Sequence, residues 1–146
     1  MTRRVLIDAD GCPVVNEAVS LAKQFGAECL ILCDTSHRFE KAGAETLIFS
    51  KGADSVDFAL VNLVKPGDIV VTQDYGLAAM CLARAARPIS QDGMEYTSGN
   101  IDGLLLARHT AKKIRSGGGR LKGPKKRAPE QDKSFEDALA RLLEEE

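Results

Sequence analysis

Carboxylates that end apolar runs are the residues of this sequence best suited to chemistry. Asp8 and Asp10 close one such run, and Asp74 follows another, Ile69–Thr72. Two carboxylates about 5 Å apart repel by roughly 3 kcal/mol at an effective dielectric near 20. Such a pair therefore either raises its pKa values or binds a cation. An all-oxygen ligand set without supporting Cys or His spacing favours Mg²⁺ or Mn²⁺, which typically polarises a phosphate and activates a water.

A further pair of acids extends this predicted metal site. Asp54 and Asp57 open a predicted helix three residues apart, so they share one face of it. Any single acid has a simpler explanation as a helix cap or a solvated side chain, whereas we interpret Asp8, Asp10 and Asp74 together as a site. The predicted catalytic residues are Asp8, Asp10 and Asp74, and the predicted metal ligands are Asp8, Asp10, Asp54, Asp57 and Asp74.

Polar and basic side chains near the acids, or in the basic segment that follows, are candidates for binding substrate. They are Cys12, Ser36, His37, Arg38, Thr72, Lys112, Lys113 and Arg115. Cys12 precedes a predicted helix, whose dipole can lower a thiol pKa and so raise its reactivity; the alternative is a small buried residue before Pro13. Thr72 is either a ligand-orienting group beside Asp74 or an ordinary strand residue.

The elements that must position these residues alternate along the chain. Short runs that are apolar on both faces predict strands at Arg4–Asp8, Cys29–Cys33, Thr46–Ser50 and Ile69–Thr72. Helical patterns follow at 13–26, where Pro13 takes the first helical position, and at 54–64, 76–86 and 101–115. This order predicts a three-layer α/β fold with a mainly parallel sheet of four to five strands and helices on both faces. If the first and fourth strands are neighbours, Asp8 and Asp74 meet at the carboxyl edge of the sheet.

The remaining chain predicts a tail after the α/β domain of residues 1–115. Ser116 and three glycines break the pattern, and 120–131 holds two prolines without apolar periodicity, which is typical of a linker. One helical face is then shared by Phe135, Leu139, Leu142 and Leu143, so we expect a final helix that docks on the body or on a partner. Residues 116–146 are therefore predicted to form a basic linker and a C-terminal helix.

Charge is distributed unevenly along the 146 residues, although the net charge is only −1. Residues 108–127 contain nine of the twenty Lys and Arg residues and no Asp or Glu, which leaves eleven basic against twenty-one acidic residues elsewhere. A basic segment is an electrostatic footprint for nucleic acid, or alternatively a solvated run. Because it lacks aromatic residues for base stacking, we predict sequence-independent phosphate contacts with RNA or single-stranded DNA.

Composition narrows the class of protein further. No apolar run approaches the roughly 18 residues that span a bilayer, and no signal-like stretch follows the N-terminal charges, so a cytoplasmic protein is expected. The four cysteines lack the paired spacing of zinc ribbons, and we interpret them as core thiols.

Several segments, in order and over almost the whole chain, resemble the bacterial YaiI/YqxD family of uncharacterised proteins. They are Asp8–Pro13, Gly52–Asp57, Pro66–Asp68, Asp74–Ala78, Tyr96-Thr97 and Asn100-Ile101. That family in turn is similar to the PIN/NYN-like fold, whose nucleases hold Mg²⁺ or Mn²⁺ with acids at the first strand end, on a middle helix and after a Thr-x-Asp strand end. The resemblance implies the same role for Asp8 and Asp10, for Asp54 or Asp57, and for Asp74.

Three functions follow as hypotheses. The first is a Mg²⁺- or Mn²⁺-dependent nuclease or phosphodiesterase. The second is a non-catalytic nucleic-acid-binding or regulatory module, in which the acids bind a structural cation or cap helices. The third is a phosphatase similar to haloacid dehalogenases, with Asp8 as the nucleophile, although Cys12 stands where that superfamily has Thr.

Overall fold

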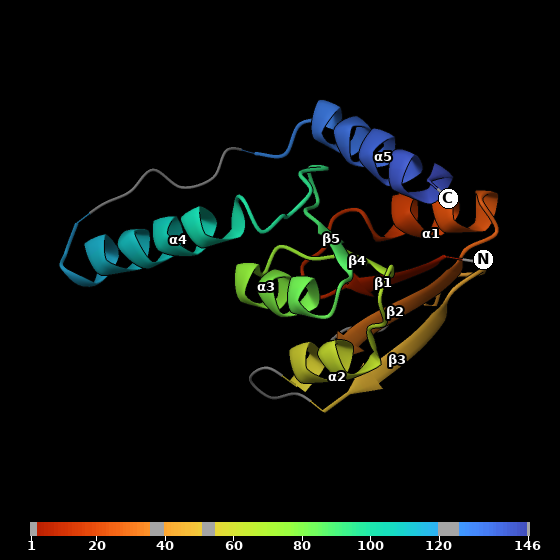
Figure 1. The fold of residues 1–146 in the computed structure, drawn as a ribbon, viewed down its shortest axis with the longest axis horizontal. Coiled ribbons are helices and arrows are strands. Elements are labelled where there is room, and N and C mark those ends of the chain that lie inside the picture. Colours follow the sequence, from red (N-terminus) through yellow and green to blue (C-terminus); the bar gives the residue numbers. More distant parts are fainter. Residues whose placement is uncertain (1–2, 36–39, 51–54, 120–125, 146) are drawn as a thin grey trace.

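A five-stranded sheet lies between two layers of helices in the computed structural model, which describes residues 3–35, 40–50, 55–119 and 126–145 (Figure 1). All strand pairings are parallel, in the order β3-β2-β1-β4-β5. The strands are β1 (Arg4–Asp8), β2 (Glu28–Asp34), β3 (Glu45–Phe49), β4 (Ile69–Val71) and β5 (Arg87–Ile89). The helices are α1 (Val15–Gln24), α2 (Ser55–Leu63), α3 (Tyr75–Ala83), α4 (Ile101–Ser116) and α5 (Pro129–Glu144). The predicted three-layer α/β fold is confirmed.

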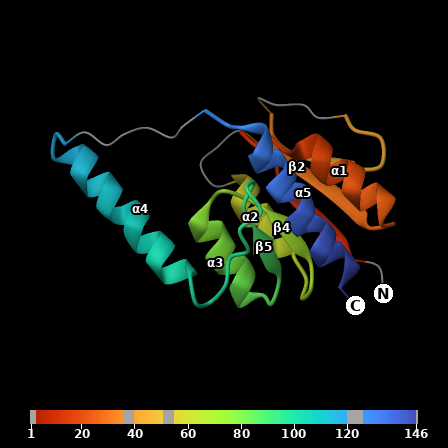
Figure 2. The ribbon, with the colours of Figure 1, turned by 90° about the horizontal axis from the view of Figure 1, so that it is seen from above.

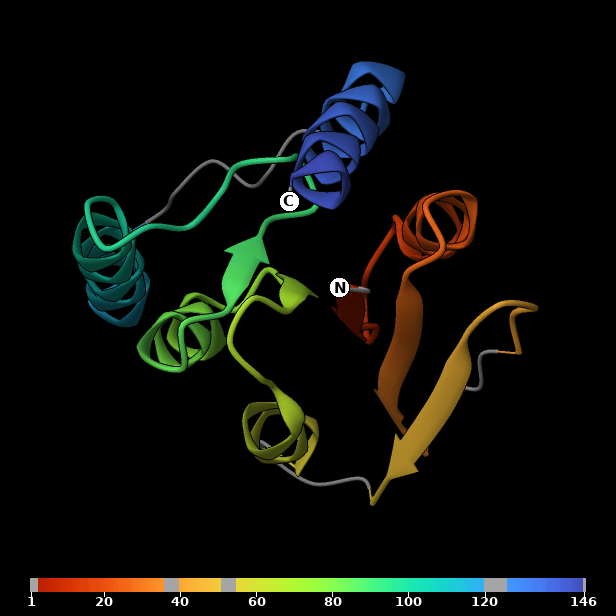
Figure 3. The same cartoon turned by 45° about the vertical axis from the view of Figure 1, so that its right-hand side comes forward.

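The alternation of side chains along β1 explains why helices cover both faces of the sheet. Val5, Leu6 and Ile7 are all fully buried, because successive strand residues point to opposite faces. Val5 and Ile7 belong to the core cluster that includes α1 and α5. Leu6 belongs to the cluster that includes α2 and α3. Figure 3 shows these two groups of helices on opposite sides of the strands.

The C-terminal helix α5 packs against α1 and completes the first of these clusters. Its fully buried residues Phe135 and Leu139 share that cluster with Val5 of the central strand. Pro129 occupies the first turn of α5, where no intrahelical N–H is needed, and the Gln131 side chain accepts a hydrogen bond from the backbone N–H of Ala128. The predicted final helix therefore docks on the body of the chain.

Helix α4 lies against α3 only at its beginning. Ile101, Leu104 and Leu105 form a small cluster with the α3 residue Ala78 and with Tyr96. Beyond Leu105, every residue of α4 except Ala111 is exposed. The helix consequently projects away from the other elements, as Figures 1 and 2 both show.

The structure corrects several boundaries expected from the sequence. Pro13 does not take the first helical position, because it lies in a turn and α1 begins at Val15. Strand β5 contains Pro88, which argues against a strand, yet it occupies the sheet edge, where a missing N–H is tolerated. The predicted linker is shorter than expected, since α5 already begins at Pro129. Strand β3 is not covered on both faces: it is the other edge strand, and Ile48 is 47% exposed.

The amino edge of the sheet is closed by ion pairs. Arg4 Nη2 lies 2.6 Å from Asp68 Oδ2, and both side chains are largely buried. At the same edge, Arg3 Nε donates to the backbone oxygen of Glu145, whose side chain is ion-paired with Arg87 at the start of β5.

In the described part of the chain, no helix is long and apolar enough to cross a membrane.

Candidate active site

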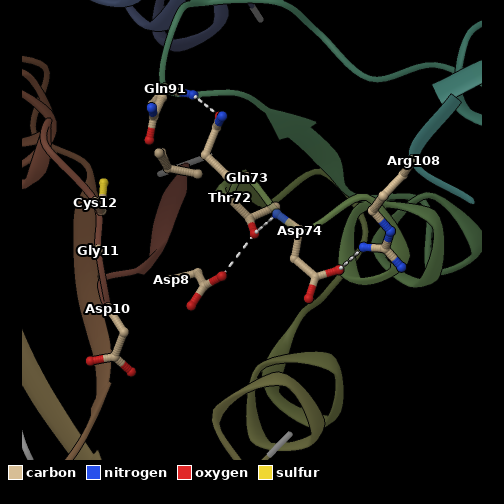
Figure 4. A pocket seen from close by; sticks show the side chains of 10 residues that line it. Asp8, Asp10, Gly11, Cys12, Thr72, Gln73, Asp74, Gln91 and Arg108 are labelled. Atoms are coloured by element: carbon tan, nitrogen blue, oxygen red, sulfur yellow. Dashed lines mark hydrogen bonds and ion pairs between the residues drawn. The ribbon is translucent and has the colours of Figure 1, made fainter. Parts of the chain in front are cut away.

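A cavity opens at the carboxyl ends of β1 and β4, where the chain after β1 leads to one face of the sheet and the chain after β4 to the other. This is a topological switch point, the place where open α/β sheets bind ligands. The cavity measures about 340 Å³. The residues lining it are Asp8, Asp10, Gly11, Cys12, Val71, Thr72, Gln73, Asp74, Gln91 and Arg108 (Figure 4). The three acids predicted as catalytic residues therefore line one cavity.

The hydroxyl of Thr72 connects two of these acids. Thr72 Oγ1 donates a hydrogen bond to Asp8 Oδ2 at 2.8 Å and accepts one from the backbone N–H of Asp74 at 3.0 Å. Thr72 is only 2% exposed, and its own backbone oxygen accepts a bond from the hydroxyl of Tyr96. The register of β1 beside β4 places this residue between the two acids, as Figure 4 shows.

Asp8 is the acid most perturbed by its surroundings. Burial is the largest effect and raises the pKa of Asp8 to about 6. The hydrogen bond from Thr72 partly opposes this rise, and repulsion from Asp74 and Asp10 adds to it. The fold therefore opposes the ionisation of this carboxyl group near neutral pH. A cation in the cavity would remove that opposition.

Asp74 makes two contacts that do not involve the other acids. Its Oδ1 accepts a hydrogen bond from the backbone N–H of Leu77 at 3.1 Å, so Asp74 is the N-cap of α3. The same oxygen lies 3.6 Å from Arg108 Nη1 of α4, and the two side chains are 38% and 57% exposed. An ion pair this exposed contributes at most about 1 kcal/mol.

Asp10 and Cys12 lie on the opposite side of the cavity, in the loop after β1 (Figure 4). The carboxylate of Asp10 accepts a hydrogen bond from the backbone N–H of Asp34 at the end of β2. Burial raises the pKa of the Cys12 thiol to about 11, and neither the nearby Val14 backbone nor Arg127 overcomes that effect. The thiol lines the cavity in its neutral form, contrary to the lowered pKa considered from the sequence.

The other predicted site residues are not gathered at this cavity. Asp57 lies on α2 and is not among the lining residues. The basic residues Lys112, Lys113 and Arg115 are exposed on α4, beyond Arg108. Asp54, Ser36, His37 and Arg38 lie outside the described residues.

The cavity also contains residues that sequence reasoning did not identify. Arg108 belongs to a helix for which the sequence gives no position relative to the acids. Gln91 follows the unpredicted strand β5, and its backbone N–H donates to Gln73 Oε1 at 2.7 Å. For Gln73, the sequence does offer a signal, because this residue lies between the two predicted site residues Thr72 and Asp74.

The carboxylate oxygens of the cavity could hold a hard divalent ion that takes few ligands from the protein. Across 3–35, 40–50, 55–119 and 126–145, no three His, Cys, Asp or Glu side chains are grouped closely enough to enclose a metal. Mg²⁺, however, is usually bound by one or two carboxylates and several waters. The carboxylates of Asp8 and Asp74, on either side of Thr72, fit that mode of binding.

The fold and the cavity define a doubly wound α/β protein with an acidic pocket at its switch point. The chain belongs to the family described as "Uncharacterized BCR, YaiI/YqxD family", which it matches over residues 6–145.

Relatives support this assignment over nearly the full length of each chain. The sequence is 54% identical over 142 residues to a UPF0178 protein of Exiguobacterium sibiricum, covering 97% of both chains. It is 46% identical to a UPF0178 protein of Clostridium acetobutylicum, covering 96% of both. A third, from Ruminiclostridium cellulolyticum, is 43% identical, covering 98% of this chain and 94% of the relative. No solved structure matches the chain.

Proposed function

We propose that this protein is a Mg²⁺- or Mn²⁺-dependent phosphodiesterase that acts on nucleic acid. The observation that carries the proposal is the convergence of Asp8, Asp10 and Asp74 on one cavity at the switch point, where the pKa of Asp8 is raised to about 6. Acids that repel one another in a partly buried cavity are stabilised by a cation. The basic segment after residue 108 supplies a second feature suited to a polyanionic substrate.

The residues of the cavity divide into three roles in this proposal. Asp8 and Asp74 would hold the ion, which supplies polarisation of the scissile phosphate and a more acidic water. Thr72 would orient Asp8 through the hydrogen bond at 2.8 Å and fix the backbone at Asp74. Asp10, anchored by the Asp34 N–H, would contribute negative charge from the other side of the cavity.

The decisive experiment combines Mn²⁺ binding with a cleavage assay on single-stranded oligonucleotides. Millimolar Mn²⁺ should raise the melting temperature of the wild-type protein, since a ligand at 100 times its Kd stabilises the folded state by about 2.7 kcal/mol. Asp8→Asn and Asp74→Asn should lose both this shift and metal-stimulated cleavage. Unchanged cleavage by both variants would refute the proposal.

Two variants of Asp74 together separate metal binding from helix capping at this position. Asp74→Asn keeps an N-cap side chain, whereas Asp74→Ala removes it and should destabilise the protein by about 1 kcal/mol in EDTA. Both should abolish the Mn²⁺ shift if the carboxylate is a ligand. Asp102→Asn, an exposed acid outside the cavity, is the control that should keep the shift.

A second candidate is a nucleic-acid-binding module without catalysis. It is favoured by the contacts of Asp74, whose Oδ1 caps α3 and pairs with Arg108, so the carboxylate already has two protein partners. In that case Mn²⁺ would give no thermal shift, and oligonucleotide binding would be unaffected by EDTA.

A further inference from the structure

Arg108 is the one cationic side chain that lines the acidic cavity among the described residues. Its guanidinium reaches Asp74 through a single N–O distance of 3.6 Å, and more than half of the side chain is exposed. This is a weak pairing, because the distance is longer than a hydrogen bond and both side chains are exposed to solvent. The guanidinium can therefore exchange Asp74 for a phosphate, which it binds in a bidentate manner.

Helical geometry places two more cations in line with Arg108. Residues advance by about 100° each along an α-helix, so Arg108, Lys112 and Arg115 all lie within about 40° of the direction of Ile101. Ile101 is the buried residue that begins the contact of α4 with Ala78 and Tyr96.

One face of α4 thus begins with the buried Ile101, lines the cavity at Arg108 and then presents the basic residues Lys112 and Arg115. Lys113, which the sequence also offers as a candidate for binding substrate, lies about 120° away from the direction of Ile101. We call Arg108, Lys112 and Arg115 the basic stripe.

The basic stripe is open to a large ligand. All three residues are exposed, and α4 projects beyond α3 over this part of its length (Figure 2). The rise of the helix separates Arg108 from Lys112 by about 6 Å and Lys112 from Arg115 by about 4.5 Å along the axis. Neighbouring phosphates of an extended strand can contact side chains at that spacing.

We propose that the basic stripe binds the backbone of a single-stranded nucleic acid and delivers one of its phosphates to Arg108 at the cavity. The positive row complements a polyanion. A cavity of about 340 Å³ is large enough for part of a nucleotide and too small to enclose a base-paired duplex. Because residues 101–116 contain no Phe, Tyr or Trp, we expect the contact to read phosphates and not bases. This inference rests on the proposed function, for which it names the substrate class.

Fluorescence anisotropy with the full chain in EDTA tests the inference apart from cleavage. The probes are fluorescein-labelled oligo(U) and oligo(dU) of about 12 nucleotides and a duplex of the same length. Arg108→Ala, Lys112→Ala and Arg115→Ala should each weaken single-strand binding by about fivefold and lower the slope of log K against log salt by about 0.7. Comparison of the two single-stranded probes shows whether the ribose hydroxyl contributes.

Two lysine variants provide the matched comparisons. Lys113→Ala, on the same helix but off the stripe, should weaken binding clearly less than Lys112→Ala. Lys133→Ala removes an exposed charge from α5 and should leave binding unchanged.

Equal losses in Lys112→Ala and Lys113→Ala, or equal affinity for duplex and single strand, would overturn the inference. Binding only to vesicles that contain an anionic lipid would also overturn it and would assign the stripe to a membrane surface. Asp8→Asn distinguishes the two proposals: loss of cleavage with retained oligonucleotide binding supports both, whereas stripe-dependent binding without any metal-stimulated cleavage would refute only the proposed function.

Discussion

At the scale of single residues, Asp8 is a side chain whose charge the fold opposes. The carboxyl is partly buried, and its pKa rises from the ordinary value of 3.8 to about 6, with burial as the largest cause. Between these two pH values the folded chain binds more protons at Asp8 than the unfolded chain. Ionisation of Asp8 therefore lowers the free energy of unfolding as the pH rises from about 4 to about 6, and the loss is complete above that range.

Asp8→Asn should accordingly stabilise the metal-free protein at neutral pH. A shift of this size corresponds to about 2 to 3 kcal/mol, and the asparagine oxygen can still accept the Thr72 hydrogen bond. Urea unfolding in EDTA at about pH 4.5 and about pH 7.5 would measure the effect, which should be larger at the higher pH. A variant less stable than wild type at the higher pH would contradict the prediction. Asp102→Asn is the exposed control.

The acids at the site illustrate what residue patterns can predict. The positions of Asp8 and Asp74 after two apolar runs were sufficient to place both at the carboxyl edge, because alternating strands and helices imply a parallel sheet. That β1 and β4 are direct neighbours was only a condition of the prediction, and the structure shows it. Arg108 could not be predicted in the same way. Its position depends on how α4 packs against α3 through Ile101 and Leu104, which is a tertiary contact without a local signal.

At the scale of elements, the turn after β5 determines how closely α5 approaches the sheet. Gly93 has φ +87°, and a Cβ at this position would lie 2.5 Å from the backbone oxygen of Ser134. Arg127, just before α5, reinforces this approach: its guanidinium pairs with Asp92 and Asp132 and donates to the backbone oxygen of Gln91. The loop that provides Gln91 to the cavity is therefore attached directly to the C-terminal helix.

Gly93→Ala should destabilise the protein more than an alanine at an unobstructed glycine of similar conformation. Gly67 has φ +84° and no neighbour within 4 Å of the position of a Cβ, so Gly67→Ala carries only the strain of the left-handed backbone. That strain amounts to about 1 kcal/mol, and the contact with Ser134 adds to it in Gly93→Ala. Equal unfolding free energies for the two variants in urea would contradict the prediction, because they would show that the loop at Gly93 moves away from Ser134 at no cost in free energy.

The same elements show why boundaries were less predictable than element types. Pro88 and the short length of β5 conceal a strand that pairs with β4 at the edge of the sheet. At the other edge, β3 has an apolar sequence typical of a buried strand, but its position in the strand order leaves Ile48 exposed. Strand order is a property of the whole sheet, and a run of four or five residues does not encode it.

At the scale of the whole molecule, one apolar cluster extends from Val5 to Leu143. Leu139→Ala, in the middle of α5, should therefore lower the free energy of unfolding by about 2 to 5 kcal/mol, the range for truncating a fully buried leucine. Urea unfolding followed by far-UV circular dichroism would measure it. Leu106→Ala, at a side chain that is 65% exposed, should stay within about 0.5 kcal/mol of wild type. Similar effects of both changes would mean that α5 does not share the core.

The positions of the two described chain ends have a practical consequence. Arg3 contacts the backbone of Glu145, and both lie at the amino edge of the sheet, where β1 and β5 begin. The acidic cavity and Arg108 lie at the opposite edge. A fusion partner or an immobilising tag joined at either end therefore starts from the edge remote from the cavity, so the protein can be held on a sensor surface with its candidate site facing the solution.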